Sequence, residues 1–212
     1  QKVVEELQKQ GLLEKTEDLT HNVGHCQRCG TTTEPLYSKQ WFLKMKELAE
    51  HAKKALKNRK VRIYPDKWGN DIFDWLENIR DWNISRQIWW GHPIPESEDV
   101  LDTWFSSALW PFAALGWPDK NHPDYKRYYP THFITSDRGI RYLWQARMIF
   151  SGIELTGKSP FKAMYIHATV LTKDGQRMSK SLETGIDPLV LIDKYGTDAL
   201  RFGLAFQTTG IQ

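Results

Sequence analysis

Residues 132–172 read HFITSDRGIRYLWQARMIFSGIELTGKSPFKAMYIHATVLT, and this stretch decides the fold. HFIT, at 132–135, predicts a buried strand, and residues 136–155 predict a loop followed by a helix. AMYIHATVLT, at 163–172, is rich in residues that favour β-structure and predicts a second strand. A strand, a loop, a helix and another strand in this order are typical of an α/β unit with parallel strands.

The parallel arrangement predicts where a ligand binds. In open α/β sheets, ligands bind beyond the carboxyl ends of the strands, where the loops at 135–139 and 172–182 are expected. The second loop begins with the turn pair Asp174-Gly175 and continues as GQRMSKS, in which cationic and hydroxyl side chains surround one methionine. Such groups suit a phosphate, although the same residues also fit a solvated surface turn.

Length and composition indicate an ordinary globular protein. The chain has 212 residues, of which 40% are hydrophobic and 26% charged, so it can bury a core. Its net charge of +3 is too small to indicate nucleic-acid binding by itself. Because it contains neither a long apolar run nor a signal peptide, we expect no membrane span and a cytoplasmic location.

Other elements are predicted by apolar spacing between capping and turn residues. Helices are expected at 1–10, 45–56, from Asn70 as N-cap, over 100–110 with a stop at Pro111, at 188–195 and after Thr197; a short strand is expected at 61–64, and strands with a small knuckle at 12–42. The ten tryptophans predict an aromatic core for most of them, with one or two left for a ligand pocket.

Four ordered blocks carry a family resemblance. They are DWNISRQIWWGHPIP at 81–95, DVLDTWFSSALWPFAALGWP at 99–118, PFKAMYIHATVLTKDGQRMSKS at 160–181, and IDPLVLIDKYGTDALRF at 186–202. Together they resemble the valyl-tRNA synthetases, class I aminoacyl-tRNA synthetases of the subgroup that includes the isoleucyl and leucyl enzymes. Trp-Trp-Gly-His and Asp-Thr-Trp-Phe-Ser-Ser favour the valyl enzymes within that subgroup.

The resemblance implies a domain organisation. It implies the second half of a class I, Rossmann-type parallel-sheet catalytic domain with a small β/knuckle appendage. Residues 1–40 would be the tail of an editing insertion, 41–95 the return connection, and 96–212 the half that carries the RMSKS loop. The His-Ile-Gly-His-type motif of the first half is not in this sequence, so we expect the isolated chain to need that N-terminal half for catalysis.

The implied reaction is the ATP-dependent activation of valine, with Mg²⁺, to valyl-adenylate and the transfer of valine to tRNA(Val). The parent enzyme is expected to be a monomer. Such a reaction needs positive charge that follows the phosphates, which a lysine on a flexible stem supplies. The resemblance implies catalytic roles for Lys180 and Arg177 and ATP contacts by His167, Met178, Ser179, Lys180 and Ser181. For His167, a hydrogen-bonded histidine at a strand end is the structural alternative.

The resemblance also implies a pocket for the amino acid. Trp90, Ile140 and Trp144 would form its apolar walls, and Asp137 would bind the substrate ammonium or a ribose hydroxyl. Both tryptophans fit a hydrophobic core equally well. Apolar walls separate aliphatic side chains by only about 1–3 kcal/mol per methylene, which explains why such enzymes carry an editing domain.

Cys26 and Cys29 form one Cys-x-x-Cys, with His21 and His25 just before it. Two thiolates and an imidazole fit part of a tetrahedral zinc site. Because a second cysteine pair is lacking, we predict reduced thiols in a knuckle and no metal, with zinc as the alternative.

Two other functions remain open at this point. Ser136-Asp137 is more typical of isoleucyl enzymes, which permits an isoleucyl-type ligase. The chain could also be a non-catalytic module that binds ATP or RNA, or an engineered scaffold.

Overall fold

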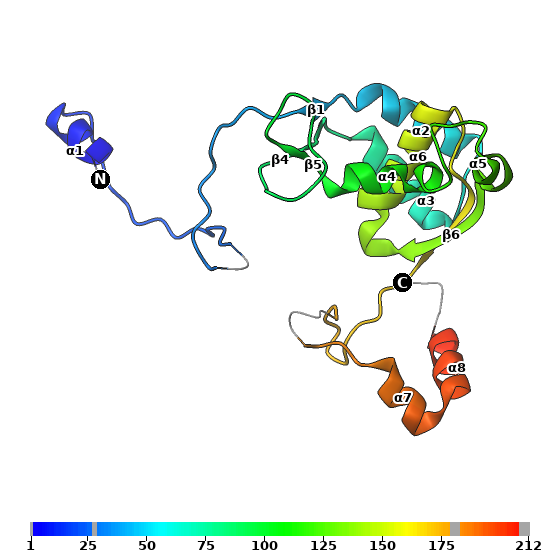
Figure 1. Cartoon of the computed structure of the whole chain (residues 1–212). Coiled ribbons are helices and arrows are strands. Elements are labelled where there is room, and N and C mark those ends of the chain that lie inside the picture. Colours follow the sequence, from blue (N-terminus) through cyan, green and yellow to red (C-terminus); the bar gives the residue numbers. More distant parts are fainter. Residues whose placement is uncertain (1, 27–28, 179–182, 208–212) are drawn as a thin grey trace. The chain divides into compact units, whose positions relative to one another are not determined.

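A computed structural model describes residues 2–26, 29–178 and 183–207 of the chain (Figure 1). The chain divides into two compact units, residues 1–39 and 40–212. None of the helices in these described ranges is both long and apolar enough to cross a membrane.

The first unit contains one helix and a knuckle. Helix α1 spans Lys2–Lys9, and Gly11, with φ of +67°, ends it as predicted. Of the strands predicted in 12–42, the described residues form only the bridge between His25 and Thr32 and strand β1, Phe42–Leu43, which belongs to the second unit. That expectation was wrong because this stretch buries no side chain in the described part, and an isolated hairpin without apolar cover is marginally stable.

The second unit is built on a parallel sheet, which confirms the predicted α/β fold. Its strands are β2, Arg62–Tyr64, β7, Phe161–His167, and β6, Thr131–Asp137, in the order β2-β7-β6. Met164 of the central strand lies opposite Ile63 on one side and Ile134 on the other. All three strands run in the same direction, so their carboxyl ends meet at one edge.

Three helices share a buried core with this sheet. They are α2, Lys46–Lys57, α3, Asp66–Glu77, and α6, Ala146–Thr156. Fully buried side chains from all of them join the strand residues in one hydrophobic cluster, which includes Ala52, Ile72, Ile149, Phe150, Phe161 and Met164. Burying each large side chain stabilises the fold by about 1.5–3 kcal/mol.

The remaining elements connect or follow this core. They are β3, Trp82–Asn83, paired with β1; β4, Ser85–Arg86, paired with β5, Val100–Leu101; α4, Thr103–Ala113; α5, Pro123–Tyr128; the 3₁₀ turn η1, Arg138–Ile140; the π-helical turn η2, Arg141–Gln145; α7, Pro188–Tyr195; and α8, Thr197–Gln207.

Two helix boundaries differ from the prediction. Helix α3 begins at Asp66 directly after Pro65, one turn before the expected cap Asn70. Helix α4 continues through Pro111. Proline cannot donate to the carbonyl of Ser107 four residues earlier, but Trp144 Nε1 donates to that oxygen at 3.0 Å. An acceptor that proline leaves unpaired is therefore satisfied from another helix.

The tryptophans are less buried than predicted. Trp82 lies in the core, at 8% exposed, whereas Trp89 and Trp90 are 91% and 76% exposed. Trp41 and Trp110 are also more than half exposed. The other six are buried or half-buried, and five of them belong to the core or pack against it, so the expectation holds for about half of the tryptophans. Residue type alone does not distinguish a core position from a loop or helix-surface position.

Candidate functional site

The strongest candidate site lies at the carboxyl ends of β6 and β7. Asp137 and His167 are the last residues of these neighbouring strands and are partners in the register. The loops that leave the strands, residues 138–140 and 168–178, therefore start side by side. This is the edge at which parallel sheets bind ligands.

The carboxylate of Asp137 organises the first loop. Its Oδ1 accepts the Gly139 backbone N–H at 2.6 Å and thereby caps η1. Its Oδ2 accepts the hydroxyl of Thr169 at 2.5 Å, which ties the loop after β6 to the loop after β7. The sequence prediction missed Thr169, which it placed inside the strand expected at 163–172; in the structure β7 ends at His167, two residues earlier.

The second loop folds back as a hairpin. Leu171 and Arg177 form an antiparallel bridge, and Thr172 N–H donates to the Gln176 carbonyl at 2.8 Å. Gly175 has φ of +76°, which fits the predicted Asp-Gly turn. The hairpin turns Arg177 back toward the first loop.

Gly139 lies where the first loop comes close to Arg177 of the second loop. A Cβ on this residue would lie 2.7 Å from Asp137 Oδ1 and 3.4 Å from Arg177 Nη1. The first distance is closer than a real Cβ contact. The absence of a side chain therefore lets the carboxylate and the guanidinium share the space, and the structure brings Asp137, His167 and Arg177 together.

The pKa of Asp137 is lowered from its ordinary value. Desolvation, the largest single effect, acts in the opposite direction. It is outweighed by the hydrogen bonds from Thr169 and Gly139 and by the charges of Arg177 and His167. A partly exposed, ionised carboxylate beside Arg177 and His167 can bind an ammonium or a hydroxyl group, while the guanidinium of Arg177 can approach phosphate oxygens.

The other predicted nucleotide-binding residues continue this loop. Met178 is half-buried directly after Arg177. Ser179, Lys180 and Ser181 lie outside the described residues.

The predicted amino-acid walls come from two separate segments of the chain. Ile140 and Trp144 are half-buried on the turns that follow β6. The Trp144 ring lies 6.4 Å from that of Trp110, between centroids. Trp90 packs edge-on against Trp89, at 6.0 Å, in the loop after β4. No ring contact within the described ranges joins Trp90 to Trp144, and the pocket stays a prediction.

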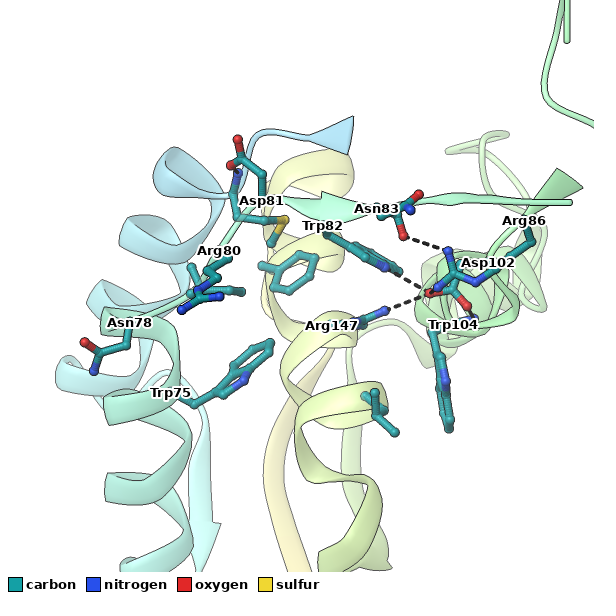
Figure 2. A pocket seen from close by; sticks show the side chains of 14 residues that line it. Trp75, Asn78, Arg80, Asp81, Trp82, Asn83, Arg86, Asp102, Trp104 and Arg147 are labelled. Atoms are coloured by element: carbon teal, nitrogen blue, oxygen red, sulfur yellow. Dashed lines mark hydrogen bonds and ion pairs between the residues drawn. The ribbon is translucent and has the colours of Figure 1, made fainter. Parts of the chain in front are cut away.

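A buried charge network, which the sequence prediction missed, lies beside a cavity of about 690 Å³ (Figure 2). Asp102 Oδ2 accepts from Trp82 Nε1 at 2.9 Å, Arg86 Nη2 at 2.9 Å and Arg147 Nη1 at 3.3 Å. The Arg147 guanidinium lies 3.6 Å from the centre of the Trp82 ring. Burial lowers the pKa of Arg147, although Asp102 opposes the change. The network joins β3, β4, α4 and α6, so its role is to hold the scaffold.

A second network supports the turn after β6. Asp71 of α3 accepts from Arg141 Nε, and from the Tyr142 hydroxyl at 2.7 Å. The Arg141 guanidinium also lies over the Trp68 ring, at 4.9 Å. Gln145, at the end of η2, is fully buried, and its side-chain amide has no hydrogen-bond partner among the described residues. The polar residues of this turn therefore anchor it to α3.

The Cys-x-x-Cys lies in the knuckle of the first unit. Cys29 Sγ donates to Thr31 Oγ1 at 3.3 Å, and both thiols are exposed and free. Hydrogen bonds from Thr31 and then from Cys26 lower the pKa of Cys29 to about 7. Across the residues that the structure describes, no three His, Cys, Asp or Glu side chains gather. Neither zinc nor Mg²⁺ has a complete protein ligand set in that part of the chain.

Comparison with known proteins identifies the class. The family described as tRNA synthetases class I (I, L, M and V) matches residues 22–97 and 96–212. The chain belongs to this family.

Within it, the chain is similar to valine–tRNA ligases, which confirms the resemblance. It is 50% identical to the enzymes of Geobacillus kaustophilus and Halalkalibacterium halodurans, over 96% of this chain and 26% of each relative. It is 47% identical to that of Thermotoga maritima, over 97% of this chain. The chain spans about a quarter of the length of these relatives.

Solved structures share the fold. Mycobacterium tuberculosis methionyl-tRNA synthetase bound by methionyl-adenylate superposes with a TM-score of 0.67 at 20% identity. The match covers 87% of this chain and 36% of that one. The apo form of the same enzyme gives the same TM-score, 0.67.

Proposed function

We propose that the chain is the part of a valine–tRNA ligase that carries the second half of its catalytic domain. The parent enzyme activates valine with ATP and transfers it to tRNA(Val). The observation that supports this most strongly is the identity of about 50% to valine–tRNA ligases over nearly the whole chain. The site at the ends of β6 and β7 supplies the chemistry.

The cationic loop acts on the phosphates of ATP. In the first step, a valine carboxylate oxygen forms a bond to the α-phosphorus, and the bond to pyrophosphate breaks. Negative charge shifts onto the departing pyrophosphate, so positive charge placed there lowers the barrier. Arg177 is turned toward this edge by the 171–177 hairpin. Lys180, with Ser179 and Ser181, belongs to the same proposal.

Asp137 and His167 bind the polar groups of the substrates. Asp137 is held ionised by its hydrogen bonds, so it can accept from the valine ammonium or from a ribose hydroxyl. His167 is exposed, and its Nδ1 lies 2.8 Å from the Ala168 carbonyl oxygen. The other ring nitrogen is then left to contact the nucleotide. Ile140, Trp144 and Trp90 are the proposed apolar walls.

The remaining partners follow from this assignment. ATP would bring Mg²⁺ with its phosphates, and the chain's own contribution is the cationic loop. The first half of the catalytic domain would complete the site. We also propose that the parent enzyme is a monomer located in the cytoplasm.

The test is a chimera. The matching quarter of the Geobacillus kaustophilus valine–tRNA ligase is replaced by this chain, and ATP–pyrophosphate exchange is measured with valine, isoleucine and threonine. We expect exchange that depends on valine, and none from the isolated chain. A preference for isoleucine would indicate the isoleucyl alternative that Ser136-Asp137 left open. No exchange by a folded chimera would indicate a non-catalytic module.

A further inference from the structure

A basic groove runs along β2, at the edge of the sheet opposite β6. Its volume is about 730 Å³, and it is formed by the end of α2, the strand β2 and the start of α3. The lining residues with polar or aromatic side chains are Lys57, Arg59, Arg62, Tyr64, Asp66, Asn70 and Phe73. We call it the β2 groove.

Its charge is strongly one-sided. Residues 53–62 read KKALKNRKVR, with six cations and no acid. Lys53 pairs with Glu50 at 2.7 Å and with Glu77 at 3.8 Å. Lys57, Arg59 and Arg62 are exposed and form no ion pair with any described residue. Asp66 is the one acid among the described residues that line the groove, so the side chains of the groove carry excess positive charge.

The backbone holds these cations in place. Helix α2 ends at Lys57, and Arg59 adopts a left-handed conformation with φ of +50°. The N–H groups of Arg59 and Lys60 donate to carbonyls of the last helical turn at 3.0 and 2.9 Å. A left-handed arginine is uncommon, and this one turns the chain directly into β2. The cations on both sides of the turn are therefore presented by a fixed backbone.

The groove also offers aromatic surface. Tyr64 is 43% exposed and supplies that surface, whereas the half-buried Phe73 ring lies under the ammonium groups of Lys57, at 5.4 Å, and Lys53, at 5.8 Å. Among the described residues, β2 pairs with β7 alone, so one side of the strand has no strand partner there. Lysine on an edge strand can simply prevent aggregation. Three cations that line one groove, Lys57, Arg59 and Arg62, exceed that need, and such a cluster is the electrostatic signature of a phosphate-backbone site.

We propose that the β2 groove binds the phosphate backbone of RNA, which, given the proposed function, is that of tRNA. The surface lies on the other side of the central strand β7 from β6, so it would add affinity without taking part in the reaction. An extended acidic peptide is the competing occupant. RNA is favoured because the cations surround an aromatic-lined cavity and the proposed reaction already requires tRNA.

The experiment compares two variants with equal charge change. Lys57→Gln, Arg59→Gln and Arg62→Gln are combined in the groove variant. Lys120→Gln, Lys126→Gln and Arg127→Gln, all exposed, form the control. The dissociation constant of the chain for a tRNA(Val) transcript is measured between about 0.05 and 0.2 M salt. Each lost phosphate contact reduces the log–log salt slope by about 0.7–0.9.

For the groove variant, the log–log salt slope of tRNA binding should be smaller by about 2–3, and binding at low salt should be more than about tenfold weaker. The single variant Arg62→Gln should lose about a third of that, and the control should match the unmodified chain. Equal losses of tRNA binding in both triple variants would overturn the proposal. Polyglutamate serves as the acidic-peptide probe, and a groove variant that binds it more weakly while its salt slope for tRNA is unchanged would also overturn the proposal. Valine-dependent exchange needs no tRNA, so its failure in the unmodified chimera would overturn the proposed function separately.

Discussion

Asp102 and Asp137 are both aspartates that receive several hydrogen bonds, yet their surroundings differ. Asp102 is buried, and its Oδ2 accepts from an indole and two guanidinium groups that come from different elements. Asp137 is half-buried, accepts from a hydroxyl and a backbone N–H, and lies at an open sheet edge. A buried carboxylate whose oxygen accepts from three side chains, as in Asp102, holds the scaffold together. A half-buried carboxylate at an open sheet edge beside Arg177, as in Asp137, is available to a ligand.

The largest effect is expected at the scaffold carboxylate. Asp102→Ala would leave the charge of Arg147 buried without its partner, which typically costs about 3–5 kcal/mol. Chemical denaturation of the isolated chain measures this loss in the free energy of unfolding. The double variant Asp102→Leu with Arg147→Met removes the buried Asp102–Arg147 pair and leaves only the more exposed Arg86 without its partner, so it should recover part of the loss. A loss below about 1 kcal/mol for Asp102→Ala would contradict the assignment.

Asp137→Asn should have a small effect on stability and a large effect on activity, the reverse of the change at Asp102. Its free energy of unfolding should change by less than about 1 kcal/mol, because the site is partly exposed. In the chimera, valine-dependent exchange should fall about 10–150-fold, which corresponds to one charge-assisted hydrogen bond to the substrate. Unchanged exchange would remove Asp137 from the site.

Gly139→Ala tests the close approach of the two loops. The added Cβ would meet Asp137 Oδ1 at 2.7 Å, and we expect exchange to fall by about tenfold, with an unfolding cost of roughly 1–3 kcal/mol. Gly185→Ala is the matched control, because a Cβ there has no described atom within 4 Å and that residue is not left-handed. Equal activity of the two variants would show that the space around Gly139 is not required.

The smallest effect concerns the knuckle thiol. The pKa of Cys29 is lowered to about 7 by Thr31, so the rate of its alkylation should rise through neutral pH rather than near its ordinary value of 9.0. Thr31→Val removes the hydroxyl partner and should move the midpoint upward. Since Cys26 also reacts, the profile is measured in Cys26→Ser. A midpoint near 9 in Cys26→Ser with Thr31 intact would contradict the described geometry.

The sequence could predict the two parallel strands, because their apolar patterns and the intervening helix are local signals. The strands were expected at 132–135 and 163–172 and lie at 131–137 and 161–167, so the second one ends five residues earlier than predicted, where the chain leaves the sheet toward the 171–177 hairpin. The sequence could place Asp137 and Arg177 in the segments at 135–139 and 172–182 for the same reason, whereas His167 was singled out by the family resemblance. Thr169 and the space at Gly139 could not be found in this way, since both depend on how two loops pack. Likewise, the continuation of α4 through Pro111 depends on Trp144, which lies 33 residues away along the chain.

Trp90 shows most clearly what residue type alone cannot predict. Its aromatic ring fits a core, a pocket wall or a surface equally well from residue type, and the structure exposes it. The Asp102 network escaped prediction for a related reason. Its members, Trp82, Arg86 and Arg147, come from separate segments that only the fold brings into contact.

In the proposed reaction, cationic side chains at the edge where β6 and β7 end lie against the phosphates of ATP while valine is activated. Arg177→Gln in the chimera tests it most directly, with ATP–pyrophosphate exchange measured as a function of valine concentration. We expect the maximal rate to fall by about 100-fold while the KM for valine is unchanged, because the charge is needed in the transition state. An unchanged maximal rate, or a rise in KM alone, would contradict the claim.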